Sequence, residues 1–200
     1  MFITFEGIDG SGKSTQIRLL RTYFESKNID AHLFREPGGT ELSEQIRSLL
    51  LHGGEEMDPV TELLLFSAAR SQLISEKVLP LLETGKVVIL DRFYDSTTAY
   101  QGYGRESAPL NQIDQLNKIA SHNLVPDITF YLEVSPESAA NRTAGAEKDR
   151  MERSGSHFFA KVAEGFRKLS QQEKRFVTIN GEKDIEEIHK IIIRTVQQFS

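Results

Sequence analysis

A glycine-rich segment near the N-terminus is the clearest candidate for chemistry in this chain. GIDGSGKS, residues 7–14, matches the pattern G-x-x-x-x-G-K-[ST] and directly follows an apolar run, where a helical pattern begins. Glycines let the backbone wrap around phosphate oxygens, consecutive N–H groups converge on those oxygens, and the helix start adds positive partial charge. The alternative is a glycine-rich turn beside an ordinary exposed lysine. The position between a strand and a helix favours a phosphate-binding loop (P-loop).

Two kinds of ligand contact are expected around this loop. Lys13 should reach the β- and γ-phosphates of a nucleotide, and Ser14 should bind Mg²⁺. A second apolar run, VVIL, ends at Asp91, and in P-loop proteins a carboxylate at the end of a neighbouring strand holds Mg²⁺ or its water. An aspartate at a strand end is otherwise a helix cap or a turn residue, but beside the P-loop we favour the metal role. The expected nucleotide-binding residues are Gly7, Ile8, Asp9, Gly10, Ser11, Gly12, Lys13, Ser14 and Thr15.

The elements that must position these residues follow from the pattern of apolar residues. Short β-rich runs alternate with helical patterns, which is typical of an α/β protein with a parallel sheet and helices on both faces. The predicted strands are residues 2–6, 31–35, 86–91, 127–134 and 175–180. Apolar residues at helical spacing indicate three helices between them. Their stripes are Ile17, Leu20 and Phe24, then Leu42, Ile46 and Leu49, then Ile113, Leu116 and Ile119.

Two later helices have start signals in the sequence. Ser135 and Pro136 are typical of an N-cap followed by the first helical position, and Asp184 with Glu187 resembles a capping box. The last helix carries a stripe formed by Ile185, Ile188, Ile192, Val196 and Phe199. Residues 143–157 are charged and lack a sustained apolar period, so we expect a mobile surface segment there.

Length and composition limit the classes of protein that remain. Two hundred residues with 38% hydrophobic and 26% charged side chains are typical of one globular domain spanning residues 1–200. The chain has no cysteine, no signal-peptide pattern and no apolar run long enough to span a membrane, so we expect a cytoplasmic protein. A net charge of −5 argues against capture of nucleic acid by an overall basic field. Any anionic ligand must therefore be held locally.

Several motifs, in a fixed order, resemble the bacterial thymidylate kinase family over nearly the whole chain. They are FEGIDGSGKST (5–15), REPGGT (35–40), LLFSAAR (64–70), DRFYDSTTAYQG (91–102) and PDITFYLEV (126–134). The resemblance implies a P-loop NTPase-type, five-stranded parallel sheet with a short lid at about 143–157, and a homodimer. It also implies transfer of the γ-phosphoryl group from ATP to dTMP with Mg²⁺.

The same resemblance assigns roles in an acceptor site. Phe66 would stack on thymine and Arg70 would bond its O4 edge; these residues are four apart, so they share a helix face. Arg92 would clamp the acceptor phosphate, because a planar guanidinium offers paired donors. Tyr100 would crowd the 2′ position and favour deoxyribose. The remaining acceptor residues are Asp9, near the 3′-hydroxyl or the phosphate, Gln101, near the base, and Arg35, Glu36, Pro37, Ser96 and Thr97.

One departure from the family concerns the cation that stabilises the transferred phosphoryl group. Some members carry an arginine in the P-loop where this chain has Gly10. We therefore expect the lid to supply that charge and to close over both nucleotides. The basic candidates are Arg142, Lys148, Arg150 and Arg153, of which Arg142 and Arg150 match the family positions best. By fold analogy, adenine contacts involve Arg142 and the turn at 180–183. The sequence leaves the Glu36–Pro37 peptide open between cis and trans.

The expected chemistry needs no catalytic histidine or cysteine. A phosphate monoester has a second pKa near 6, so its oxygen is largely ionised before attack at neutral pH. Another nucleotide or nucleoside kinase on the same scaffold is the main alternative. A P-loop GTPase would need a guanine-reading N/T-K-x-D motif, and the nearest string, NKIA at 117–120, lacks the aspartate. A nucleic-acid-associated ATPase is disfavoured by the acidic charge.

Overall fold

A five-stranded parallel sheet forms the centre of the molecule, as the sequence predicts. The computed structural model describes residues 1–52, 56–145 and 149–199. The strands lie in the order β2-β3-β1-β4-β5, and every neighbouring pair is parallel. Their bounds are β1 Phe2–Glu6, β2 Ala31–Arg35, β3 Val87–Asp91, β4 Ile128–Glu133 and β5 Phe176–Asn180. The last three strands begin one residue later than predicted, and β4 also ends one residue earlier.

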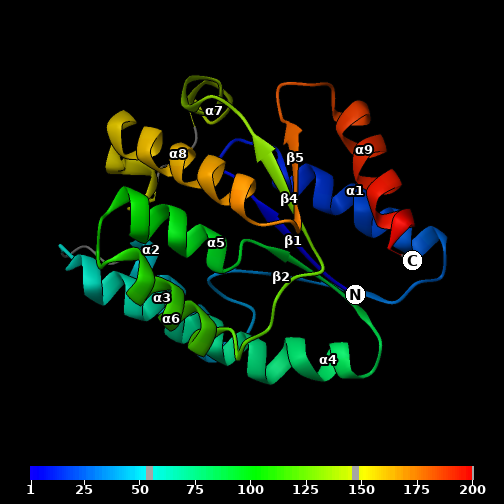
Figure 1. The fold of residues 1–200 in the computed structure, drawn as a ribbon, viewed down its shortest axis with the longest axis horizontal. Helices are drawn as coiled ribbons and strands as arrows, with labels where there is room; N and C mark the ends of the chain where they lie inside the picture. The colour runs from blue at the N-terminus through cyan, green and yellow to red at the C-terminus, as the bar shows by residue number, and fades with distance from the viewer. Residues whose placement is uncertain (53–55, 146–148, 200) are drawn as a thin grey trace.

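Helices cover both faces of this sheet (Figure 1). On one face, α1 and α9 pack against side chains such as Ile3, Phe5 and Phe130. On the other face, Phe2 and Leu90 pack against the helices that follow β2 and β3. Both faces are therefore buried, which explains why the strands are almost continuously apolar. The helix bounds are α1 Lys13–Ser26, α2 Glu41–His52, α3 Pro59–Leu73, α4 Leu79–Glu83, α5 Tyr94–Thr97, α6 Leu110–Ala120, α7 Pro136–Arg142, α8 Ser156–Gln172 and α9 Ile185–Gln198. Shorter helical turns are η1 Ile74–Val78, η2 Thr98–Gly104 and η3 Glu152–Ser154.

The predicted apolar stripe of α2 is wrong in its rotation about the helix axis. Leu42 and Leu49 are 48% and 56% exposed, whereas Ile46, Leu50 and Leu51 are buried. The side of α2 that packs on α3 decides this rotation, and a leucine-rich helix has several rotations of similar apolar content. In two other helices, residues at the ends of the predicted stripes are exposed: Ile119 in α6, and Ile185 and Phe199 at α9.

The start signals of the late helices have mixed outcomes. Ser135 caps α7 as predicted, because its hydroxyl accepts a hydrogen bond from the Ser138 N–H at 3.1 Å. Asp184 occupies the N-cap position of α9, but its side chain makes no capping hydrogen bond, so the predicted capping box is wrong. Within 143–157, the described residues include the turn η3 and a buried Met151. Part of this segment therefore packs on the body of the protein.

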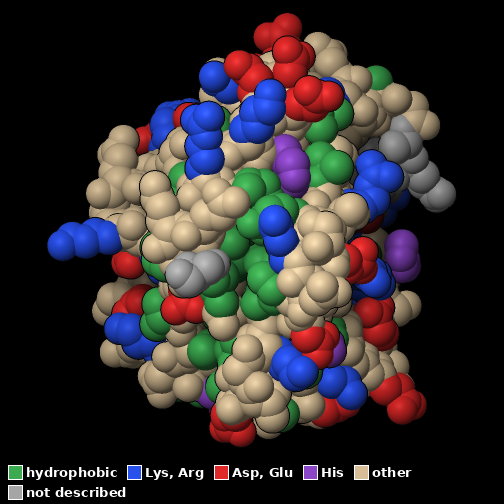
Figure 2. Space-filling model, turned by 90° about the vertical axis from the view of Figure 1, so that its right-hand side faces the viewer, with side chains coloured by type: hydrophobic (Ala, Val, Ile, Leu, Met, Phe, Trp, Pro, Cys, Tyr) green, Lys and Arg blue, Asp and Glu red, His purple; other side chains and the backbone are tan. Residues whose placement is uncertain are grey.

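The face of the molecule drawn in Figure 2 carries no large area of a single charge. On the face in Figure 2, acidic and basic side chains are interspersed, and hydrophobic side chains gather near the middle. Among the helices within 1–52, 56–145 and 149–199, none is long and apolar enough to cross a membrane.

Candidate active site

The glycine-rich loop leaves the central strand β1 and leads into α1. Gly7 and Gly10 have φ values of 137° and 82°, a region that side chains with a Cβ rarely adopt. A Cβ on Gly7 would lie 2.7 Å from the Leu132 carbonyl oxygen, and one on Gly10 would lie 2.6 Å from that of Ala139. Close backbone approach therefore requires glycine at both positions. The loop also leaves no room for the arginine that some family members carry in place of Gly10.

Lys13 is the first residue of α1 and lies almost wholly buried. Its ammonium donates hydrogen bonds to the carbonyl oxygens of Gly7 at 2.9 Å and Ile8 at 3.2 Å. Burial, and then the nearby charge of Arg92, lowers the pKa of Lys13. The negative charge of an anionic group at the loop would offset both effects, so this lysine is placed as a phosphate ligand requires.

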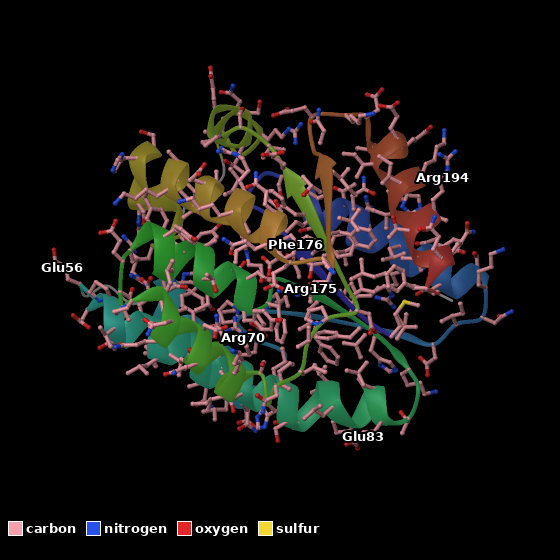
Figure 3. The ribbon with its side chains drawn as sticks, in the orientation of Figure 1. Glu56, Arg70, Glu83, Arg175, Phe176 and Arg194 are labelled. Atoms are coloured by element: carbon pink, nitrogen blue, oxygen red, sulfur yellow. The ribbon has the colours of Figure 1, made fainter. Side chains whose placement is uncertain are left out.

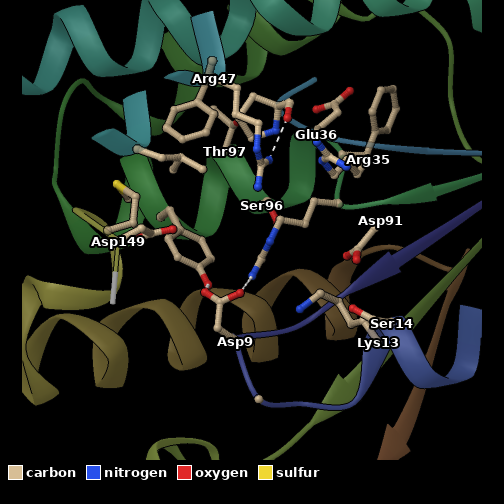
Figure 4. Close-up of a pocket in the computed structure, with 18 of the residues that line it drawn as sticks. Asp9, Lys13, Ser14, Arg35, Glu36, Arg47, Asp91, Ser96, Thr97 and Asp149 are labelled. Carbon is tan, nitrogen blue, oxygen red and sulfur yellow. Dashed lines mark hydrogen bonds and ion pairs between the residues drawn. The ribbon is translucent and has the colours of Figure 1, made fainter. Parts of the chain in front are cut away.

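A cavity of about 460 Å³ runs from this loop to α3. Phe66 and Arg70 both line it, in agreement with their predicted shared helix face. The predicted acceptor residues that line it are Asp9, Arg35, Glu36, Pro37, Phe66, Arg70, Arg92, Ser96, Thr97, Tyr100 and Gln101. Gly10, Gly12, Lys13, Ser14, Thr15, Asp91 and Arg142 line the same cavity, whereas Gly7, Ile8, Ser11 and Arg150 are not among its lining residues. Figure 4 shows several of these side chains converging on the space between the P-loop and the helices.

Arg92 lines the cavity and is held there by three polar partners. Its guanidinium contacts Asp9 Oδ1 at 2.6 Å and donates to the Gly7 carbonyl at 2.9 Å and to Ser96 Oγ at 3.1 Å. It also lies over the Tyr100 ring, 5.1 Å from the ring centroid. Burial opposes ionisation of Asp9, but the positive charges of Arg92 and Lys13 outweigh it and lower the Asp9 pKa to about 2. The pair is therefore charged at neutral pH.

Glu6, which sequence reasoning missed, holds the loop that carries Arg92. This buried carboxyl accepts hydrogen bonds from the N–H of Phe93 at 2.8 Å and of Ser96 at 3.3 Å, and contacts Ser96 Oγ at 2.6 Å. Arg92 has φ +72°, which a non-glycine residue adopts at a cost. Burial, and then the charge of Asp95, raises the Glu6 pKa to about 8. The available sequence signal was a glutamate ending a buried strand directly before the P-loop.

Arg70 and Glu36 form a buried pair on the far side of the cavity. Arg70 Nε and Nη2 both contact Glu36 Oε2, at 2.7 and 2.6 Å. Burial raises the Glu36 pKa even though Arg70 opposes the shift. Arg70 Nη1 is buried and has no hydrogen-bond partner among the described residues. The Glu36–Pro37 peptide is cis, which answers the question that the sequence left open.

A second buried acid, Glu62, connects α3 to the lid segment and to η2. Gln101 donates its amide N–H to Glu62 Oε1 at 2.9 Å, and Arg150 contacts Oε2 at 2.6 Å. Arg105 lies 3.5 Å from Oε1, and Arg150 also donates to the Leu50 carbonyl at 2.8 Å. Arg150 is thus held against α2 and α3 in this structure.

The other predicted lid cations lie in different surroundings. Arg142 ends α7 and donates to the carbonyl oxygens of Gly10 at 3.3 Å and Gly181 at 2.9 Å. It therefore bridges the P-loop and the turn at 180–183, where adenine contacts are expected. Arg153 is exposed, and Lys148 lies outside the described residues.

Sequence reasoning missed five further residues that line the cavity: Arg47, Leu51, Phe93, Asp149 and Met151. Arg47 of α2 lines it and donates to the Pro37 carbonyl at 2.8 Å, and Met151 lines it from the lid segment. Arg47 follows the buried Ile46 in α2. Because the rotation of this helix was predicted wrongly, the sequence did not show that the Arg47 side chain faces the cavity.

The residues predicted to hold Mg²⁺ fit that ion. Asp91 Oδ1 is buried and has no hydrogen-bond partner within the described part of the chain, and Ser14 lines the same cavity. Figure 4 shows both side chains beside Lys13. No group of three or more acidic or histidine side chains suited to a metal occurs among the described residues. Mg²⁺ commonly takes one or two protein oxygens and completes its shell with phosphates and water.

Comparisons with known proteins give one consistent result. The family model described as thymidylate kinase matches residues 5–192. A thymidylate kinase from Chlorobium luteolum is 49% identical over 209 residues, covering 99% of this chain and 97% of that protein. One from Thermoanaerobacter sp. is 44% identical, covering 99% and 98%. The crystal structure of thymidylate kinase from Ehrlichia chaffeensis is similar, with a TM-score of 0.80 and 39% identity over 98% of each chain.

Proposed function

The chain belongs to the thymidylate kinase family, and from this premise we propose that it transfers the γ-phosphoryl group of ATP to dTMP, giving ADP and dTDP. The observation that carries the proposal is one cavity that is lined both by Lys13 of the P-loop and by the buried Arg70 of α3. A phosphate loop alone is shared by many enzymes. A second ligand space opening directly beside it is what a kinase for a nucleoside monophosphate needs.

Arg92 is proposed to hold the phosphate of dTMP. Its position beside Lys13 and its fixed guanidinium suit a dianionic acceptor whose oxygen attacks the γ-phosphorus while the bond to the ADP oxygen breaks. The acceptor oxygen carries no proton near neutral pH, so no general base is required. Mg²⁺, held by Ser14 and Asp91, would neutralise charge on the donor phosphates. Asp9 keeps Arg92 in place and lies within reach of the acceptor's sugar.

The deoxynucleoside is proposed to occupy the space between α3 and η2. Phe66 would stack on the base and Tyr100 would lie against the sugar at C2′, in agreement with their places on the cavity wall. The other acceptor-side residues, Arg35, Glu36, Pro37, Ser96, Thr97 and Gln101, line this space.

Of the lid arginines, we assign the cation beside the transferred group to Arg142. It already contacts the P-loop at the Gly10 carbonyl, and it lines the cavity, whereas Arg150 does not. To reach a phosphate there, Arg150 would have to leave its ion pair with Glu62. Its proposed role is to anchor the lid segment to α2 and α3.

A homodimer in the cytoplasm is proposed from the same family membership. Six exposed apolar side chains on α2, α3 and α6 support a partner surface there: Leu42, Leu49, Val60, Leu64, Leu110 and Ile119. These helices lie together on one side of the sheet (Figure 1). Measuring the mass of the protein in solution by light scattering tests this proposal.

The function is tested by measuring ADP release from ATP with a panel of nucleoside monophosphates. We expect the highest kcat/KM for dTMP, and little turnover without an acceptor. Arg92→Ala should lose most of the activity, whereas Arg167→Ala, at an exposed arginine of α8, should not. Turnover of GTP without an acceptor would instead favour a GTPase. Near-normal kcat and KM in Arg92→Ala would refute the role of Arg92.

A further inference from the structure

We propose that Glu62 determines which pyrimidine the cavity accepts, by fixing the amide orientation of Gln101. The inference rests on the proposed function, because it concerns the base of the acceptor nucleotide. Glu62 itself is 1% exposed, and it is not among the residues that line the cavity. It is therefore a positioning residue that acts through Gln101.

The orientation of Gln101 follows from the chemistry of its partner. A carboxylate accepts hydrogen bonds and does not donate them, so the Gln101 side chain must turn its NH₂ group toward Glu62 Oε1, at 2.9 Å. The carbonyl oxygen of the same amide is then the end that remains for a ligand. Gln101 is 2% exposed and lines the cavity, so rotation of its amide would leave buried polar groups without partners.

A buried carboxylate also fixes Arg70, and there the group left for a ligand is a hydrogen-bond donor. Glu36 engages Nε and Nη2 of Arg70 and leaves Nη1 buried, with no hydrogen-bond partner in the described structure. Arg70 lies in the interior of the molecule (Figure 3). The cavity thus offers one donor, Arg70 Nη1, and one acceptor, the Gln101 oxygen, each set by its own buried carboxylate.

This donor and acceptor match one class of pyrimidine. Thymine and uracil present an accepting O4 and a donating N3–H, whereas cytosine presents a donating N4 amine and an accepting N3. Cytosine would therefore oppose a donor to Arg70 and an acceptor to Gln101. A site built around buried hydrogen-bonding groups rejects the mismatched analogue strongly, because those groups are left without partners.

Glu62→Gln should reverse the amide of Gln101. Arg150 lies 2.6 Å from Oε2, whereas Arg105 lies farther away, 3.5 Å from Oε1. The new amide at position 62 would therefore turn its oxygen toward Arg150 and its NH₂ toward Gln101. Gln101 would then accept from position 62 and present its own NH₂ to the ligand. That group suits the accepting N3 of cytosine and opposes the N3–H of uracil.

The test compares kcat/KM for dUMP and dCMP, which differ only in the donor and acceptor pattern of the base. In the wild type we expect dUMP to be favoured by at least about 100-fold. In Glu62→Gln this ratio should narrow by at least about 10-fold, as expected for reversing one directional contact. Glu133→Gln, the same change at a carboxylate paired with Arg167 outside the cavity, should leave the ratio unchanged. An unchanged ratio in folded Glu62→Gln would overturn the inference.

If circular dichroism shows that Glu62→Gln does not fold, Glu62→Asp is measured instead, because it retains the charge facing the arginines and draws the carboxylate back by one methylene. The ratio should then narrow by at least about 3-fold, and an unchanged ratio would again overturn the inference.

If the wild type releases no ADP with dTMP, the proposed function fails. If it does so but does not distinguish dUMP from dCMP, only the inference about Glu62 fails.

Discussion

Glu6→Gln should remove a pH dependence of stability that the wild-type protein carries. The Glu6 carboxyl lies beneath the loop that presents Arg92, and it is wholly buried against Phe93 and Ser96. Burial, and then the charge of Asp95, raises its pKa from 4.5 to about 8, although Arg92 opposes the shift. The folded protein therefore binds one proton more than the unfolded chain over the pH range between those two values.

The sign and size of the effect follow from this difference in bound protons. Stability from the protonated carboxyl is fully present below pH 4.5 and is lost as the pH rises toward about 8. Each pH unit inside that window lowers the free energy of unfolding by about 1.4 kcal/mol. Raising the pH from about 6 to about 7.5 should therefore cost the wild type about 2 kcal/mol. For a chain of this length that corresponds to a fall in Tm of about 4–8 °C.

The assay is urea unfolding of the wild type and Glu6→Gln at both pH values. An amide at position 6 does not titrate, so the variant lacks this contribution while every other titrating group stays. The free energy of unfolding of the wild type, relative to the variant, should fall by about 2 kcal/mol between the two pH values. If the difference in free energy of unfolding between the wild type and Glu6→Gln is the same at both pH values, Glu6 is ionised in the folded protein. The reasoning from its burial would then be wrong.

Three further changes test the site. Lys13→Ala should lower kcat by about 10²- to 10³-fold, because a cation facing the phosphates is lost, as measured by ADP release. Arg70→Ala leaves Glu36 buried without its partner, so urea unfolding should show a loss of about 3–5 kcal/mol and kinetics a higher KM for dTMP. Gly10→Ala should lower Tm more than Gly85→Ala. Both glycines have positive φ, but of the two only Gly10 would bring a Cβ against a backbone carbonyl, at 2.6 Å. Equal losses of Tm would refute the close-approach argument.

The P-loop and the five strands were predictable because their signals are local. A strand buried on both faces is a short apolar run, and the spacing within residues 7–14 alone defines the loop. Ser135 was equally readable as a cap, because its partner lies three residues away. In each case the residues that decide the structure are neighbours in the sequence.

Features that depend on distant partners were not predictable in the same way. The rotation of α2 is decided by the helix that it meets, which explains why Leu42 and Leu49 were misplaced and why Arg47 was missed. Glu6 meets Ser96 across 90 positions in the sequence, and Glu62 meets Gln101 across 39. The only local sign for Glu6 is its place at the end of a buried strand, and that sign does not show which loop the carboxyl will contact. Only the packing of the elements shows which acids hold which arginines.

Acidic side chains in the cavity explain why the net charge of the chain does not decide whether it binds anions. A value of −5 predicts only that no overall basic field attracts the ligands. In the structure, carboxylates hold arginines that line the cavity, as Asp9 does for Arg92 and Glu36 for Arg70. Such pairing lowers the reorganisation needed when an anion arrives, because each guanidinium is already held in one direction. An acidic chain can therefore bind two highly anionic nucleotides, since the position of each cation matters more than the sum of the charges.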